Sequence, residues 1–119
     1  MVEKLNEYQK LALETARYPT VLMGGDHLIG IRWVYPAMKL AGEAGEVCEK
    51  FGKIIRDKDG AINERDREAV LLELGDVLWY VAILAYELHA TLEDVAQLNI
   101  DKLRSRRERG VLGGSGDDR

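Results

Sequence analysis

Residues 72–80, LELGDVLWY, decide how this sequence is interpreted. The stretch is rich in Leu, Val, Trp and Tyr, as the middle of a buried helix would be, yet it carries two acids, Glu73 and Asp76. Earlier in the chain, GEAGEV repeats the arrangement with Glu43 and Glu46. Both stretches read Glu-x-Gly-acid-Val, so a pair of carboxylates recurs in one sequence context.

The composition is that of a single globular domain. The chain has 119 residues, of which 46% are apolar and 32% charged. Its formal net charge of −4 offers no basic surface, so we expect neither a nucleic-acid partner nor a membrane partner. A single cysteine, Cys48, excludes an intrachain disulfide. Without a signal-like N-terminus or a run of about 20 apolar residues, a cytoplasmic location is expected.

Helical spacing of apolar residues dominates the chain. Pro36 suits the first turn of a helix, whereas residues 18–35, with Pro, Gly-Gly-Asp and a further Gly, predict a long ordered loop. Asn63 and Thr91 are each followed three residues later by an Asp, as in an N-terminal capping box. We therefore expect helices over about residues 3–17, 36–57, 64–88 and 92–107.

The short connections between these helices predict an all-α fold, with each protomer an antiparallel four-helix bundle. The bundle would form one domain over residues 1–110. Residues 111–119, VLGGSGDDR, are Gly-rich and polar, and they predict a flexible tail.

Helical geometry puts both acid pairs at the edge of an apolar stripe. At about 100° per residue, Glu43 flanks such a stripe on the second helix and Glu73 flanks one on the third. If the stripes pack together, the four acids converge, and they must then take up protons or bind a cation. Oxygen ligands without His or Cys favour Mg²⁺, with Mn²⁺ as the other candidate. The stripes comprise Leu40, Ala44, Val47, Cys48, Phe51 and Ile55, and Val70, Leu74, Val77, Leu78 and Val81.

The third helix is apolar on a second side as well, through Leu72, Trp79 and Ile83. A helix that is apolar on two sides is buried on two sides, so we expect self-association through this helix, with a tetramer favoured over a dimer. Gly45 and Gly75, between the acids, each cost about 1 kcal/mol relative to Ala. Either the close approach of a ligand or helix, or tight helix packing, explains them.

Several of these features have a simpler explanation. A single acid pair at this spacing is common on a solvated helix face. Trp33 fits the core as well as a stack on a base, and His27 is a lone loop histidine. Lys102 and Arg106 share a helix face that could meet phosphate or solvent.

The two acid motifs, in an all-helical chain of this length, resemble the MazG-type nucleoside triphosphate pyrophosphohydrolases. The segments LAGEAGEVCEK, ELGDVLWYVA and LNIDKLRSR carry the resemblance, which covers roughly residues 5–110. It implies an all-α enzyme that hydrolyses nucleoside or deoxynucleoside triphosphates to the monophosphate and pyrophosphate. It also implies oligomers whose sites are completed by a neighbouring subunit. The residues it implies as Mg²⁺ ligands are Glu43, Glu46, Glu73 and Asp76.

The resemblance extends to substrate contacts. It implies that Asn99 and Lys102, with Arg106 one turn on, contact phosphate, and that Tyr80 lies near the nucleotide. One departure concerns Gly42, because many members carry a further Glu just before the first motif.

We therefore expect metal-assisted hydrolysis at the α-phosphorus, in nucleotide-pool control or housecleaning. Glu46 is a candidate for the base that takes the water's proton, and Lys53 would join the phosphate contacts. Trp33, His27 and Tyr80 would line the base pocket, and a purine preference, with dGTP as the candidate substrate, is a hypothesis.

Two other classes of protein remain as alternatives. A di-iron carboxylate enzyme would pair Glu with Glu-x-x-His, whereas here the residue three after each Glu is an acid. A non-catalytic helical interaction module would need no divalent ion and would tolerate acid-to-Gln changes in the second and third helices.

Overall fold

The fold is known from a computed structural model, which describes residues 3–116. Four helices make up most of it, so the expected all-α class is confirmed. In chain order the elements are α1 (Glu3–Glu14), β1 (Val21–Gly24), β2 (His27–Gly30), α2 (Val34–Lys58), α3 (Glu64–Glu87) and α4 (Leu92–Glu108).

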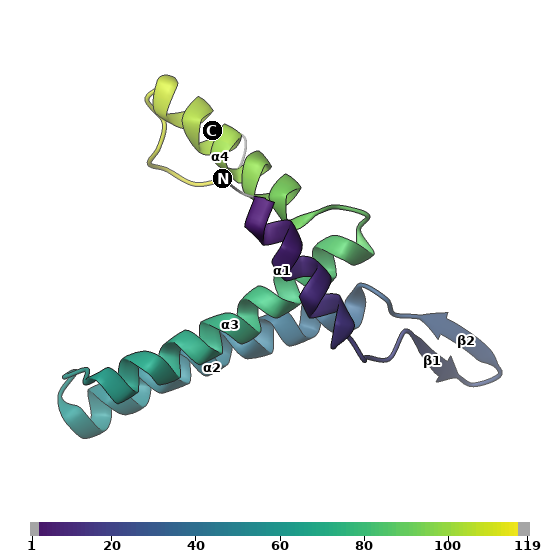
Figure 1. The fold of residues 1–119 in the computed structure, drawn as a ribbon, viewed down its shortest axis with the longest axis horizontal. Coiled ribbons are helices and arrows are strands. Elements are labelled where there is room, and N and C mark those ends of the chain that lie inside the picture. The colour runs from purple at the N-terminus through teal and green to yellow at the C-terminus, as the bar shows by residue number, and fades with distance from the viewer. Residues whose placement is uncertain (1–2, 117–119) are drawn as a thin grey trace.

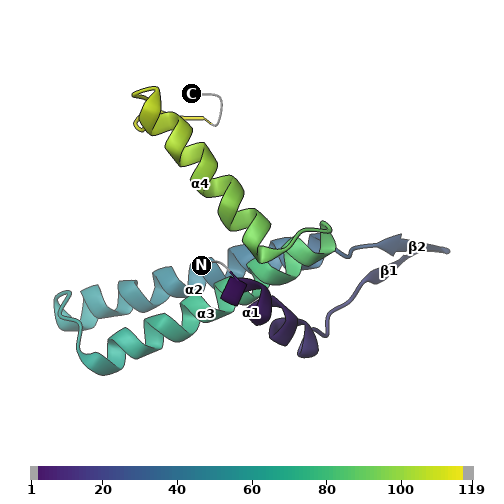
Figure 2. The same cartoon turned by 45° about the horizontal axis from the view of Figure 1, so that its top comes forward.

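The long helices α2 and α3 lie side by side and antiparallel along their whole length, as Figure 1 shows. The short helix α1 crosses the C-terminal half of α3 and also contacts α4. In both views α4 leans away from the α2–α3 pair, and the hairpin of β1 and β2 projects from the end where α2 begins (Figures 1 and 2). The protomer is therefore an open arrangement of four helices around one long antiparallel pair.

The ends of α3 and α4 follow from their capping residues. The Asn63 side chain accepts a hydrogen bond from the Asp66 N–H (2.8 Å), and the Asp66 carboxylate accepts one from the Asn63 N–H (3.2 Å). Thr91 and Asp94 form the same reciprocal pair at the start of α4. Each box satisfies two backbone donors that a helix N-terminus leaves without an intrahelical partner. Both predicted boxes are confirmed.

The first helix is shorter than expected, because it ends at Glu14 rather than at residue 17. At this end the backbone hydrogen bonds change from the α-helical spacing of four residues to a spacing of three. The Thr15 N–H donates to Ala12 O, and the Ala16 N–H donates to Leu13 O (both 3.1 Å). The Thr15 hydroxyl also donates to Ala12 O (2.9 Å). A threonine that bonds the preceding turn competes with helix propagation.

The prediction of a loop over residues 18–35 was wrong in part, because this segment contains an antiparallel hairpin. Val21 pairs with Gly30 and Gly24 with His27. The two-residue turn begins at Gly25, whose φ of +64° is the left-handed value that tight hairpin turns need and glycine tolerates. The strands have apolar residues without alternation, so the periodicity of the sequence gave no strand signal.

The most buried part of the protomer lies where α1, α3 and α4 meet. Ala82 and Ile83 on α3 are fully buried there and pack with Ala12 and Leu92. The buried Gln9 joins the three helices, since its amide donates to Ala82 O (3.0 Å) and its carbonyl accepts from the Leu92 N–H (3.1 Å). A buried amide satisfied on both sides fixes the relative orientation of the elements it joins.

By contrast, the α2–α3 pair exposes apolar side chains. Leu72 is 69% exposed and Ile55 66%. Cys48, in the predicted apolar stripe, is exposed as well, so the expectation that the stripes are covered does not hold within one protomer. The radius of gyration, 17.9 Å, exceeds the value of about 13.5 Å expected for a compact domain of this length.

By length and composition alone, α3 is long and apolar enough to cross a membrane. Glu73 and Asp76 interrupt its apolar stretch, so α3 is not the continuous run of about 20 apolar residues that the sequence was expected to lack. The core helix of a soluble protein passes the same test, and Glu73 and Asp76 near the middle of α3 would be costly in lipid.

Candidate metal centre

Three carboxylates from α2 and α3 converge where the two helices face each other. Glu43, Glu73 and Asp76 each have an oxygen within 4.8 Å of the others. The side chains of Glu43 and Glu73 are only 18% and 20% exposed, whereas Asp76 is open to solvent. The antiparallel packing of the helices brings acids that are far apart in the sequence together, as the repeated motif predicted.

Glu46, the fourth predicted ligand, lies outside this cluster. It is exposed on α2, one turn beyond Glu43, and its side chain helps to lower the pKa of Glu49, after the larger effect of Lys53. Its predicted roles as ligand or base therefore remain predictions.

Two lysines form long ion pairs with the cluster. Lys39 Nζ lies 3.9 Å from a Glu43 oxygen, and Lys50 Nζ lies 3.7 Å from a Glu73 oxygen. Partly exposed pairs at such distances contribute little stability. A divalent cation can therefore replace the lysines at these carboxylates at small cost.

A cavity of about 310 Å³ opens directly on the acids, and it is lined by Glu43, Asp76, Trp79 and Tyr80. The two aromatic rings pack edge to face, with centroids 4.8 Å apart. Burial, and then the nearby Tyr35, Glu43 and Asp76, raise the pKa of the Tyr80 hydroxyl. Tyr80 therefore stays neutral near pH 7 and can donate a hydrogen bond beside the acids.

Trp79 was missed as a site residue, because its helical position suggested a subunit interface. It lies one turn after Asp76 on α3, and its indole N–H donates to the Thr15 hydroxyl (3.0 Å). This bond ties the cavity wall to the end of α1. The three-residue spacing from Asp76 is the sequence signal that could have identified Trp79.

The helix α1 also comes close to the acids. Burial, and secondly the charge of Asp76, raise the pKa of Tyr8 on α1, so this phenol lies within electrostatic reach of the cluster. The same side chain packs against the core around Ile83. Tyr8 therefore lies between the acid cluster and the core.

The predicted phosphate contacts of α4 lie away from the cluster. Asn99 and Lys102 line a separate cavity with Val95 and Leu98, and within residues 3–116 α4 contacts α1 and α3 but not α2. Arg106 is only 5% exposed and donates to Gly116 O (3.2 Å). One protomer thus keeps these three residues apart from its own acids, and their substrate roles remain predictions.

The remaining predicted residues lie on different segments of the chain. Trp33 precedes the first residue of α2 and is 59% exposed. Of the predicted base contacts whose side chains the structure describes, Tyr80 lines the acid cavity and Trp33 does not. The side chain of His27 lies outside the described residues. Lys53 lines a neighbouring cavity between α2 and α3.

The donor set of the cluster fits a hard divalent cation. All three groups are carboxylates, and nitrogen and sulfur ligands are absent from it. Such oxygen sites suit Mg²⁺ or Mn²⁺ better than zinc or copper. A site with three protein ligands also leaves room for water and for the oxygens of a substrate phosphate.

Comparisons with known proteins identify the family of the chain. The model of the MazG nucleotide pyrophosphohydrolase domain matches residues 37–111, which include all four acids of the two motifs. The chain is 49% identical over 112 residues to Gene 37 protein of Mycobacterium phage L5, a match that covers 94% of this chain and 96% of that protein. No solved structure gave a significant match. On these matches, the chain belongs to the MazG nucleotide pyrophosphohydrolase domain family.

Proposed function

We propose that this protein is a Mg²⁺-dependent pyrophosphohydrolase of nucleoside and deoxynucleoside triphosphates, working in the cytoplasm to control the nucleotide pool. The observation that carries the proposal is the convergence of Glu43, Glu73 and Asp76 beside a cavity walled by Trp79 and Tyr80. The carboxylates suit a cation, and the aromatic rings suit a nucleoside base. An acidic protein binds a triphosphate most readily through such a cation.

The reaction follows from these groups. The oxygen of a water molecule bonds to the α-phosphorus, the bond from that phosphorus to the bridging oxygen breaks, and pyrophosphate leaves with the bond's electrons. The water's protons pass to a carboxylate, for which Glu46 is our candidate, and to solvent. Held by Glu43, Glu73 and Asp76, Mg²⁺ would neutralise phosphate charge and lower the pKa of the attacking water.

We also propose that the enzyme works as an oligomer assembled through α3, with a tetramer favoured. The accessible surface, 8968 Å², exceeds by about 2,500 Å² the surface expected for a compact monomer of this mass, an excess typical of obligate interfaces. A methyl group added at Gly45 or Gly75 would meet nothing within 4 Å, so the glycines leave space for a ligand or a second copy. Asn99 and Lys102 would then reach the acids of a neighbouring subunit.

The test is product analysis with each common NTP and dNTP, with and without Mg²⁺. The proposal expects monophosphate plus pyrophosphate, formed only with the metal, and the rates across the panel also test the dGTP preference. Turnover to diphosphate and phosphate, or none at all in a folded sample, would overturn it. Absence of turnover in a sample that binds Mg²⁺ would favour the non-catalytic interaction module.

A further inference from the structure

Within residues 3–116, the hairpin of β1 and β2 packs against none of the helices. In both overall views it projects from the end of the α2–α3 pair where α2 begins (Figures 1 and 2). A two-stranded hairpin on its own is at best marginally stable in water, and it gains independent stability from further strands or from packing against a helix. The protomer therefore leaves the hairpin without the packing that such a hairpin needs.

Both faces of β1 are apolar and open to solvent. Successive side chains of a strand point to opposite faces, yet Val21, Leu22 and Met23 are 46%, 52% and 68% exposed. The sequences of the two strands, VLMG and HLIG, contain no Asp, Glu, Lys, Arg or Pro. Natural proteins use charged residues and proline to keep an exposed strand edge from pairing. The hairpin therefore has the features of an edge that pairs with another strand.

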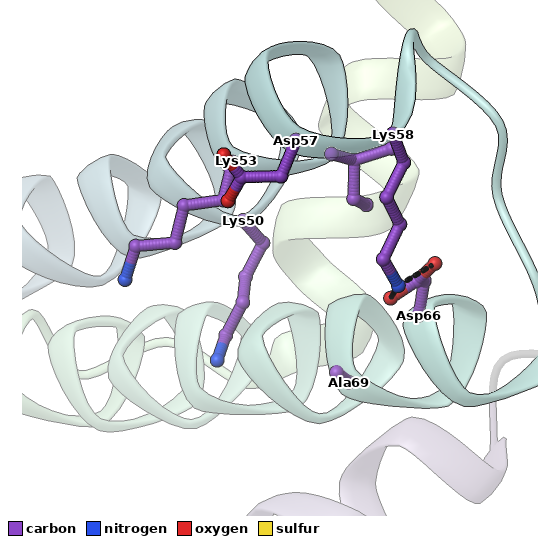
Figure 3. A pocket seen from close by; sticks show the side chains of 7 residues that line it. Lys50, Lys53, Asp57, Lys58, Asp66 and Ala69 are labelled. Atoms are coloured by element: carbon purple, nitrogen blue, oxygen red, sulfur yellow. Dashed lines mark hydrogen bonds and ion pairs between the residues drawn. The ribbon is translucent and has the colours of Figure 1, made fainter.

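The opposite end of the α2–α3 pair is charged and makes its own contacts. Lys58 pairs with Asp66 at 2.7 Å beside the turn that joins the helices, as Figure 3 shows. Nearby, the Arg56 guanidinium donates to the Asp57 carboxylate (2.7 and 2.8 Å). Like charges directly opposite each other destabilise paired strands. Since the strands of the hairpin carry no such charges, two copies of it can approach without this repulsion.

The backbone of β1 suits pairing with a second copy of itself. The Ile31 N–H donates to Thr20 O (2.8 Å), in register with the pairs of β1 and β2. Because hydrogen-bonded pairs alternate along an antiparallel ladder, the backbone groups of Val21 and Met23 point away from β2. If two copies of β1 meet antiparallel about a twofold axis at Leu22, Val21 lies opposite the partner subunit's Met23. Each of these pairs then exchanges two hydrogen bonds.

The root of the hairpin is held in place. The rings of Tyr18 and Tyr35 stack with centroids 6.3 Å apart, and the Tyr18 hydroxyl donates to Glu87 on α3. Ile31, directly after β2, is buried. These contacts fix the direction in which the hairpin leaves the helices, so its exposed strands present a defined surface to a partner.

We propose that β1 pairs with β1 of a second copy of this chain, so that two hairpins form one four-stranded antiparallel sheet with Leu22 at its twofold axis. The edge of β2 is less suitable, because Gly30 occupies one of its outward positions and glycine weakens a strand. Two four-residue strands bury less than the roughly 1,200 Å² of a stable interface. The sheet would therefore join dimers that α3 holds together. A closed tetramer needs a second twofold contact of this kind.

The first test is a disulfide across the proposed axis. In a C48S background, which removes the single native cysteine, L22C puts two thiols in a non-hydrogen-bonded pair. The Cα atoms of such a pair lie about 4.5 Å apart, a distance that a disulfide accepts. Under mild oxidation, L22C/C48S should form a covalent dimer at least about tenfold faster than the control L28C/C48S. Leu28 is 71% exposed but lies one strand away from the axis. Equal rates would overturn the proposal.

The second test measures the mass of the assembly by sedimentation. Met23 and Leu28 pair across the hairpin, and the backbone N–H of each points outward, where proline is tolerated. M23P should halve the sedimenting mass, because it removes donors of the proposed sheet. L28P is the matched control and should keep the wild-type mass, and both variants should keep the helical content of wild type. An unchanged mass in M23P, or an equal loss in L28P, would contradict pairing through β1.

This inference goes beyond the proposed activity and does not depend on it. Cross-linking through L22C, in a protein that hydrolyses no nucleotide, would support the sheet and overturn the proposed function. Hydrolysis to monophosphate and pyrophosphate, by a wild-type protein that sediments as a monomer or dimer, would support the function and overturn the sheet.

Discussion

The two halves of α3 serve different purposes. The first half, taken through Asp76, carries Glu73 and Asp76 and leaves apolar residues such as Leu72 in solvent. The second half contains Ala82 and Ile83, which are fully buried against α1 and α4. Through Ala82 and Ile83, which pack with Ala12 and Leu92, the buried half joins α3 to α1 and α4.

This difference shows that the mutually repelling carboxylates lie in the half of α3 outside the core. Three carboxylates within 4.8 Å of one another oppose folding in the absence of a cation. The core around Ile83 supplies stability that does not depend on the acids. Substitutions in the two halves should therefore separate catalysis from stability. E73Q and I83A test that separation directly, and two further variants test the junction of the helices and their capping boxes.

The largest effect is expected from E73Q in the charged half. Loss of one ligand charge should lower kcat/KM at least about 100-fold, because the remaining acids hold the cation less tightly. The free energy of unfolding in metal-free buffer should stay the same or rise, since one source of repulsion is gone. Steady-state hydrolysis and urea denaturation measure the two quantities.

The matched control is E68Q, because Glu68 is exposed on the same helix outside the cluster. It should keep wild-type activity. An E73Q protein with full activity would remove Glu73 from the metal centre.

The next largest effect is expected from I83A in the buried half. Truncation of a fully buried Ile should lower the free energy of unfolding by about 2–5 kcal/mol, which urea denaturation at fixed protein concentration can measure. L72A is the control, because Leu72 is 69% exposed in one protomer. That variant should weaken self-association, seen by sedimentation, more than it destabilises the protomer. Equal destabilisation by both would contradict the division of α3.

A smaller effect is expected from Q9L at the junction of the three helices. Leu fills the space but leaves Ala82 O and the Leu92 N–H without the amide partners they have now. Unsatisfied buried groups cost about 1–3 kcal/mol. Because Gln9 also joins α4 to α3, the amides at the start of α4 should exchange faster with solvent. Unchanged exchange there would mean that the packing of Leu92 is enough to hold the start of α4 against α3.

The smallest effect concerns the capping boxes at acidic pH. The Lys58 ammonium and then the Asn63 N–H hold the pKa of Asp66 below its usual 3.8, and bonds from Thr91 do the same for Asp94. Stability from a lowered folded pKa is fully present above pH 3.8 and is lost as the pH falls through the folded value. D66N/D94N should therefore lose less stability than wild type between about pH 5 and about pH 2. If the free energy of unfolding fell equally in the variant and in wild type over this pH range, these pKa shifts would be contradicted.

Much of the fold could be predicted from local signals. Capping residues such as Asn63 and Thr91 gave the starts of α3 and α4, and apolar spacing gave the four helices. The hairpin around Gly25 was missed, because its strands show no alternation and apolar residues such as Leu22 and Leu28 are exposed. The lean of α4 depends on tertiary bonds of Gln9, which no local pattern encodes.

The candidate site was predictable to a similar extent. The repeated motif identified the acids of the cluster, since helix periodicity fixes which side chains share an edge. It could not tell that Glu46 lies outside the cluster, because helix geometry turns Glu46 about 60° away from Glu43. Only packing decides whether a side chain at that angle still faces the other helix. Trp79 was missed for the same reason, since α3 is apolar on both sides.

The most direct test of the central claim is hydrolysis in water enriched in ¹⁸O, with Mg²⁺ and the best substrate of the panel. Attack of water on the α-phosphorus puts the label in the nucleoside monophosphate and leaves the pyrophosphate unlabelled, which is the predicted result. Label in the pyrophosphate, or in inorganic phosphate released with a diphosphate, would contradict the assignment of Glu43, Glu73 and Asp76 to a pyrophosphohydrolase centre.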